Sequence, residues 1–113
     1  MAMTVPASDD PAIALDKDGF LVNLSDWSEP VAQWLAQRDG VTLGADHWEV
    51  LTALRAFYEQ YQLSPATRPL IKYLALTLGP EKGNSAHLNR LFNGTPAKLA
   101  AKFAGLPKPT NCI

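Results

Sequence analysis

A single residue of this chain, Cys112, carries a strongly nucleophilic side chain, and its position is unusual. It is the one cysteine among 113 residues and stands next to the last residue, after a segment that holds Pro107 and Pro109. Structural cysteines are usually buried and inert, whereas a thiol on a Pro-containing arm can be inserted into the pocket of another protein. Cys112 is therefore the candidate catalytic residue. The alternative is that a cysteine is merely tolerated at this position and has no function.

The chain offers no obvious base to activate this thiol. A thiol with the reference pKa of about 8.5 is only a few per cent ionised at pH 7, and the nearest cation in the sequence, Lys108, is four residues away. If Cys112 reacts, its activation comes from the site of a partner. This pattern favours a carrier over an autonomous cysteine hydrolase.

The residue inventory excludes several other chemistries. One cysteine cannot form an intramolecular disulfide, and His47 and His87 are forty residues apart with no second ligand at metal-binding spacing. The sequence also lacks a G-x-G-x-x-G or Walker motif for a nucleotide. We expect no metal and no cofactor.

The charges of the chain are separated along its length. Residues 1–81 hold all eleven acids and five bases, whereas residues 82–113 hold five bases and no acid. Such a separation indicates a complementary partner, either nucleic acid or an acidic protein face. Lys98, Lys102 and Lys108 are the candidate docking cations, and an ordinary solvated face is the alternative.

Length and composition favour one globular domain over residues 1–113. Hydrophobic residues make up 47% of the chain and charged residues 19%, which suits a packed core. The N-terminus has no signal-peptide pattern, and the most apolar stretch, LIKYLALTL, is too short to span a bilayer. We expect a soluble cytoplasmic protein with a disordered N-terminus over residues 1–11.

The fold class predicted from periodicity is mostly α, a compact helical bundle with a small N-terminal β-hairpin and an extended arm. Two short apolar runs flank the turn Asp16-Lys17-Asp18-Gly19, which is a hairpin pattern. Residues 106–113 are predicted to form a mobile C-terminal arm, because two prolines there disfavour helix. Seven extended residues would carry the thiol about 20 Å from the last helix.

Five helices are predicted between the hairpin and the arm. The second, capped by Asp46 with Glu49 three residues later, has a wide apolar stripe and is expected at the centre of the core. The predicted helices run from the Ser28 cap to Gly40, from Asp46 to Tyr61, from Pro65 to Gly79-Pro80, from Ser85 to Phe92, and from the Thr95 cap to Gly105.

Three segments of the sequence resemble the TusE/DsrC family of sulfur carriers. They are DKDGFL in the hairpin, HWEVLTALRAFYEQYQLSPATRPLIKYL through two helices, and PAKLAAKFAGLPKPTNCI at the end. The resemblance runs from about residue 12 to the last residue. It implies a helical fold with a hairpin and a mobile arm, and it implies that Cys112 receives sulfane sulfur as a persulfide. The protein would then be a sulfurtransferase of the carrier type, without turnover in the absence of partners.

The two branches of this family imply different partners. In the TusE branch, a hetero-oligomeric relay complex donates the sulfur and a tRNA 2-thiouridylase bound to tRNA accepts it for the wobble uridine. In the DsrC branch, the carrier works with dissimilatory sulfite reductase and uses a second arm cysteine near position 101. That position is Ala101 in this chain, which favours the TusE branch.

The sequence also allows two other functions and indicates one further candidate site residue. A DsrC-like accessory protein could work with one cysteine. The third helix, the Gly79-Pro80 turn and the segment from Ser85 also resemble a helix-turn-helix for nucleic acid. Arg68 is a candidate anchor for a persulfide anion if the arm folds back on the body.

Overall fold

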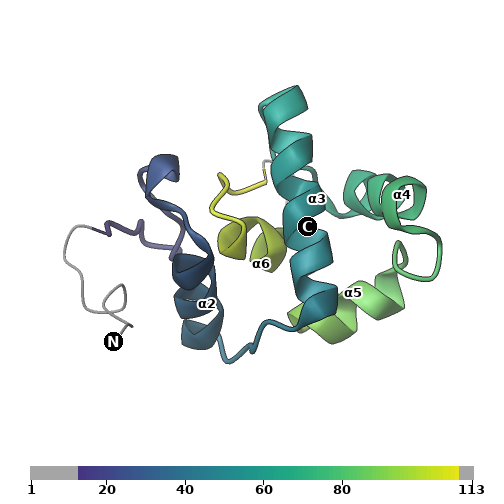
Figure 1. Cartoon of the computed structure of the whole chain (residues 1–113), viewed down its shortest axis with the longest axis horizontal. Helices are drawn as coiled ribbons and strands as arrows, with labels where there is room; N and C mark the ends of the chain where they lie inside the picture. The colour runs from purple at the N-terminus through teal and green to yellow at the C-terminus, as the bar shows by residue number, and fades with distance from the viewer. Residues whose placement is uncertain (1–12, 110–113) are drawn as a thin grey trace.

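The computed structural model describes residues 13–109, and helices dominate this part of the chain (Figure 1). No helix among these residues is long and apolar enough to cross a membrane. The elements are a short 3-10 helix, η1 (Leu24–Asp26), and five α-helices: α2 (Glu29–Arg38), α3 (Ala45–Tyr61), α4 (Thr67–Leu78), α5 (Ser85–Phe92) and α6 (Pro96–Phe103).

The short helix α6 lies at the centre of the molecule, between α2 and α3 (Figure 1), and it packs on α2, α3, α4 and α5. Its buried side chains are mostly small, so that neighbouring helices can approach it closely; they include Ala97, Ala100, Ala101 and Phe103. The helix expected at the centre of the core, α3, does bury Val50, Leu51 and Leu54 there, but it packs mainly on α4 and α6, whereas α6 packs on four helices. The wide stripe of α3 ends in Tyr58, which is half-buried, and Tyr61, which is exposed.

The predicted β-hairpin is not found, because residues 13–109 contain no strand. One antiparallel bridge joins Leu15 to Leu21. The turn between them is built as expected: Gly19 adopts a φ of 87°, and the Asp16 carboxylate accepts hydrogen bonds from the backbone N–H groups of Asp18 and Phe20. The chain enters η1 soon after the bridge, so the pairing stays too short for a ladder, and a lone hairpin is marginal.

The start of α3 differs from the predicted Asp46 cap. Gly44 is the N-cap, and its backbone N–H donates to His47 Nδ1 at 3.0 Å. His47 Nε2 lies 2.9 Å from the Leu91 carbonyl, to which it donates. The His47 imidazole therefore fixes the start of α3 against α5.

The other helix boundaries agree with the sequence prediction except at the start of α4, which begins at Thr67, two residues after Pro65. The Val31 N–H donates to Ser28 Oγ, which caps α2. Pro96 occupies the first turn of α6 after Thr95, and Gly105 follows its last turn. These signals are local, so they could be identified without knowledge of the packing.

Lys102 places a charge on the central helix, and one carboxylate compensates for it. The side chain of Lys102 is 11% exposed, and its Nζ donates to Asp39 Oδ2 at 2.9 Å. The ammonium also lies 5.6 Å from the centroid of the Phe20 ring. A buried ammonium without a partner is strongly destabilising, so Asp39 stabilises the fold.

Substituting Asp39→Asn should lower the free energy of unfolding by about 1–3 kcal/mol, because the Lys102 ammonium stays buried without a carboxylate. Substituting Lys102→Met should cost less than about 1 kcal/mol, since it removes the charge and keeps the packing. Urea unfolding of both variants measures this difference. Equal losses for the two variants would contradict the role given to Asp39.

Candidate functional site

Cys112, the candidate catalytic residue, lies outside the described residues, as does the predicted N-terminal segment 1–11. The structure describes instead the point at which the C-terminal arm leaves the body, from Ala104 to Pro109. This arm root fixes where residues 110–113 begin. The geometry of the root therefore limits where the thiol can be presented.

The C-terminal end of α6 satisfies three of its carbonyl groups with the backbone. The Leu106 N–H donates to the Ala101 carbonyl at 2.9 Å, and the Gly105 N–H donates to the Lys102 carbonyl at 3.1 Å. This pair of bonds, with Gly105 at a φ of 73°, is a Schellman motif. The Ala104 N–H donates to the Ala100 carbonyl.

Two side chains satisfy the next two carbonyl groups. Trp27 Nε1 donates to the Phe103 carbonyl at 2.9 Å, and Arg55 Nη1 donates to the Ala104 carbonyl at 2.6 Å. The Arg55 guanidinium also lies over the Trp27 ring, 3.8 Å from its centroid. Burial lowers the pKa of Arg55 from its usual value, and the charge of Glu59 opposes this effect. Trp27 and Arg55, which belong to two segments of the N-terminal half of the sequence, thus clamp the arm root together.

The first four residues of the predicted mobile arm lie against the body. Leu106 is 3% exposed and Pro109 is buried. Ser64 Oγ donates to the Pro107 carbonyl at 2.6 Å, and Lys108 Nζ donates to Asp18 Oδ2 at 3.2 Å. The expected reach of about 20 Å assumed an arm extended from Leu106, whereas only the three residues after Pro109, with a span of at most about 11 Å, separate this held segment from Cys112 in the sequence.

The four predicted docking residues do not form one group. Lys98 is half-buried on α6, and Lys108 is exposed on the arm root. Arg68 is exposed on α4, and α4 lies on the side of α3 that faces away from α2 (Figure 1). Lys102 points inward to Asp39. We therefore leave Lys102 out of the cations that could meet a partner directly.

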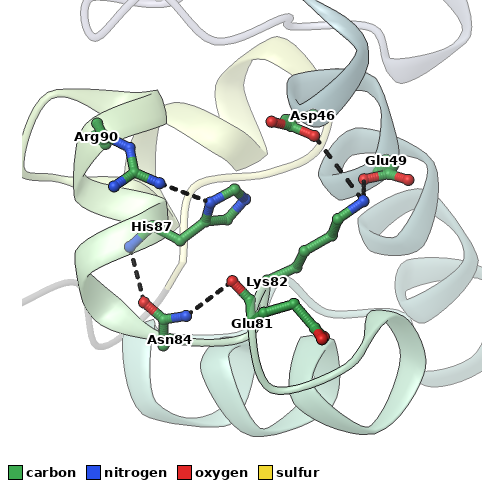
Figure 2. Close-up of polar contacts among 7 residues, drawn as sticks. All are labelled: Asp46, Glu49, Glu81, Lys82, Asn84, His87 and Arg90. Atoms are coloured by element: carbon green, nitrogen blue, oxygen red, sulfur yellow. Dashed lines mark hydrogen bonds and ion pairs between the residues drawn. The ribbon is translucent and has the colours of Figure 1, made fainter.

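The charge separation seen in the sequence is used largely inside the molecule. Figure 2 shows Lys82, in the turn between α4 and α5, reaching the α3 carboxylates of Asp46 and Glu49. The hydrogen bond to Glu49 raises the pKa of Lys82. Together with the pairs that Lys102 and Lys108 form, three of the five bases in residues 82–113 bind carboxylates of residues 1–81.

Trp27, Arg55 and Ser64 were not identified as site residues from the sequence. Arg55 did carry a signal: it follows Leu51 by four residues and precedes Tyr58 by three, which places a charge on the apolar face of its helix. Such a residue needs buried acceptors. The sequence does not show that these acceptors are carbonyl groups of residues 103 and 104.

The described residues hold no group of three or more His, Cys, Asp or Glu side chains arranged to bind a metal ion. The α4–α5 pair also departs from the helix-turn-helix alternative. The connection runs over residues 79–84, which is longer than the three or four residues usual for that motif.

Comparison with known proteins places this chain among proteins of one family. A family model described as "DsrC like protein" matches residues 7–113. The chain is 52% identical over 101 residues to Sulfurtransferase TusE of Sodalis glossinidius, covering 89% of this chain and 94% of that protein. It is 50% identical to Sulfurtransferase TusE of Escherichia coli, covering 89% and 93%.

Two solved structures of DsrC proteins are similar to this chain in both fold and sequence. The NMR structure of Allochromatium vinosum DsrC has a TM-score of 0.81 and 48% identity, covering 89% of this chain and 90% of that one. The oxidized gamma-subunit of the dissimilatory sulfite reductase (DsrC) from Archaeoglobus fulgidus has a TM-score of 0.77 and 36% identity, covering 89% and 92%.

Substituting Gly105→Ala should destabilise the protein by about 2–4 kcal/mol. An added Cβ would lie 2.6 Å from Trp27 Cγ, and the left-handed backbone adds its own cost. Gly40→Ala is the matched control, because Gly40 has a φ of 77° and no atom within 4 Å of the added Cβ. Its cost should be only about 1 kcal/mol. Thermal unfolding compares the two, and similar losses would show that Trp27 does not restrict this position.

Substituting Lys108→Met should raise the pKa of Asp18 toward 3.8. The hydrogen bond from Lys108 is the main reason that the pKa of this carboxyl is lowered. Wild type should therefore keep the pair above the pKa of Asp18 and lose it as the pH falls through that pKa. Carboxyl NMR titration measures the shift, with Lys17→Met as a control that should have a smaller effect. An unchanged Asp18 titration in Lys108→Met would show that the arm root is not held by this pair.

Proposed function

The chain belongs to the TusE/DsrC family, and from that premise we propose that it is a sulfur-relay carrier of the TusE type. It accepts sulfane sulfur as a persulfide on Cys112 and passes this sulfur to a tRNA 2-thiouridylase for 2-thiolation of the wobble uridine. The observation that carries the proposal is the 50–52% identity to sulfurtransferases named TusE over 89% of the chain.

The transfer at Cys112 is an exchange without net oxidation. The Cys112 thiolate attacks the terminal sulfur of a donor persulfide, the donor sulfur–sulfur bond breaks, and the donor leaves as a thiolate that takes up a proton. Cys112 then carries the persulfide to the acceptor, whose own nucleophile takes the terminal sulfur and releases the Cys112 thiolate. The donor is a hetero-oligomeric relay complex and the acceptor is the thiouridylase bound to tRNA, which places the carrier in the cytoplasm.

A single thiol supports the TusE type of carrier. The sequence contains one cysteine, so an internal disulfide or trisulfide cannot close. Position 101, where the DsrC branch has its second cysteine, lies in the core rather than on the arm: Ala101 is 1% exposed within α6.

The arm root supports a defined presentation of the thiol. Trp27, Arg55 and Ser64 hold the carbonyl groups of residues 103, 104 and 107. A partner that binds the body therefore meets residues 110–113 at a fixed starting point. Lys98 and Lys108 are the docking cations nearest to this point in the sequence, and Arg68 remains a candidate anchor for the persulfide anion.

A DsrC-like accessory role is the second candidate function. It is favoured by the 48% identity to A. vinosum DsrC and the likeness to the A. fulgidus gamma-subunit. The two functions differ in partner. Pull-down with a reagent that traps Cys112 as a mixed disulfide should recover a thiouridylase or a relay complex, whereas recovery of sulfite reductase alone would favour the second function.

Incubation with a persulfide donor should add one sulfur atom to the wild-type protein and none to Cys112→Ser, as measured by intact mass. Dithiothreitol should remove the added sulfur, because a persulfide is reducible. Alkylation of Cys112 before the incubation is the control for sulfur attached elsewhere. Equal sulfur uptake by Cys112→Ser would contradict the proposed site.

A further inference from the structure

A polar hollow lies beside the arm root, between the turn at residues 17–19, the end of α2 and the last turn of α6. Its volume is about 410 Å³. Three distant parts of the sequence form it, and Lys108 adjoins it through the ion pair with Asp18. We call it the basic hollow; its lining residues are Lys17, Asp18, Gly19, Arg38, Asp39 and Lys102.

Cations outnumber carboxylates in and around the basic hollow. Lys17, Arg38 and Lys102 line it with Asp18 and Asp39. Lys108 is paired with Asp18, and Lys98 is close enough for its charge to help lower the pKa of Asp18. With the Asp16 carboxylate of the same turn included, five cations against three carboxylates give a local formal charge of +2, although the whole chain carries −1. The field at this face is therefore opposite to that of the rest of the molecule.

The cations of the basic hollow are partly fixed in place. Lys102 is held between Asp39 and the Phe20 ring, and its burial weakens the screening of its charge by water. The Arg38 guanidinium lies 5.4 Å from the Trp34 ring centroid. Among residues 13–109, Lys17 and Arg38 form no ion pair, so both remain available to an incoming anion.

The position of the basic hollow relates it to the transfer site. Lys108 stands four residues before Cys112 in the sequence, and it touches Asp18 of the lining. Since the chain between Pro109 and Cys112 spans at most about 11 Å, a protein that receives the thiol must approach this part of the body.

We propose that the basic hollow is the docking site for an acidic surface of a protein partner in the sulfur relay. This inference rests on the proposed function and names the chemistry of the partner's face, in which carboxylate side chains bind Lys17 and Arg38. The mixture of charges favours protein over RNA. Asp18 and Asp39 would repel a continuous phosphate backbone, and Trp34, which could stack on a base, is covered by Arg38.

The test measures sulfur transfer to full-length protein from the persulfide-loaded donor relay complex of the same organism, in single-turnover reactions at low and high salt. Lys17→Glu should slow transfer about threefold at low salt, and Lys17→Glu/Arg38→Glu should slow it about tenfold or more. High salt should reduce these differences. Lys72→Glu, the same charge reversal at an exposed lysine of α4, should stay within about twofold of wild type.

Loading by glutathione persulfide separates this inference from the proposed function, because a small donor needs no docking surface. All variants should be loaded by it at the same rate. The relay complex could load Lys17→Glu/Arg38→Glu as fast as wild type, or it could load Lys72→Glu as slowly as the double variant. Either result would show that the basic hollow is not the docking site, and neither would contradict the carrier function. If Lys17→Glu/Arg38→Glu accepts sulfur from the relay complex as fast as wild type but no longer binds free tRNA in a filter assay, the basic hollow binds RNA and the proposal is overturned. Failure of wild type to take sulfur from either donor would overturn the carrier function itself.

Discussion

The arrangement of the arm depends on the need to satisfy the last carbonyl groups of α6. This helix is the centre of the core, so its C-terminal carbonyls cannot all turn to water, and an unpaired buried carbonyl is costly. The Schellman motif satisfies the carbonyls of Ala101 and Lys102, and Trp27 and Arg55 satisfy those of Phe103 and Ala104. The same contacts that complete the core therefore fix the direction in which the chain continues toward Cys112.

Most of the basic residues near the C-terminus form ion pairs inside the molecule. In the sequence, the separation of acids from bases indicated an external partner, yet three of the five C-terminal bases bind carboxylates of the same chain. These pairs attach the turn at Lys82, the central helix and the arm root to the N-terminal part. Residues 17, 38 and 98 are left without ion pairs beside the arm root, within the part of the chain that the structure describes. The excess positive charge is thus small in amount and concentrated where a partner of the arm must bind.

Local signals could be identified from the sequence, and signals that depend on packing could not. Ser28, Pro96 and Gly105 mark helix ends through backbone chemistry that needs no neighbour, and the structure confirms them. The Asp46 cap was wrong because His47 competes for the same helix start through a contact with Leu91, forty-four residues away. The hairpin is not found because strand pairing needs length on both sides, and η1 follows too soon. The Trp27–Arg55 clamp could not be predicted, since it joins three segments that only the packing of α6 brings together. Cys112 was chosen from the sequence and stays a prediction.

In the proposed function, sulfur passes through this chain on its way to tRNA. Sulfur-35 can be placed on the protein as a persulfide, the loaded protein separated from its donor, and the label then followed into tRNA in the presence of the thiouridylase and ATP. We expect the label to leave the protein and to appear in 2-thiouridine at the wobble position. Label that stays on the carrier, while the same thiouridylase thiolates the tRNA with another sulfur source, would contradict the proposed function.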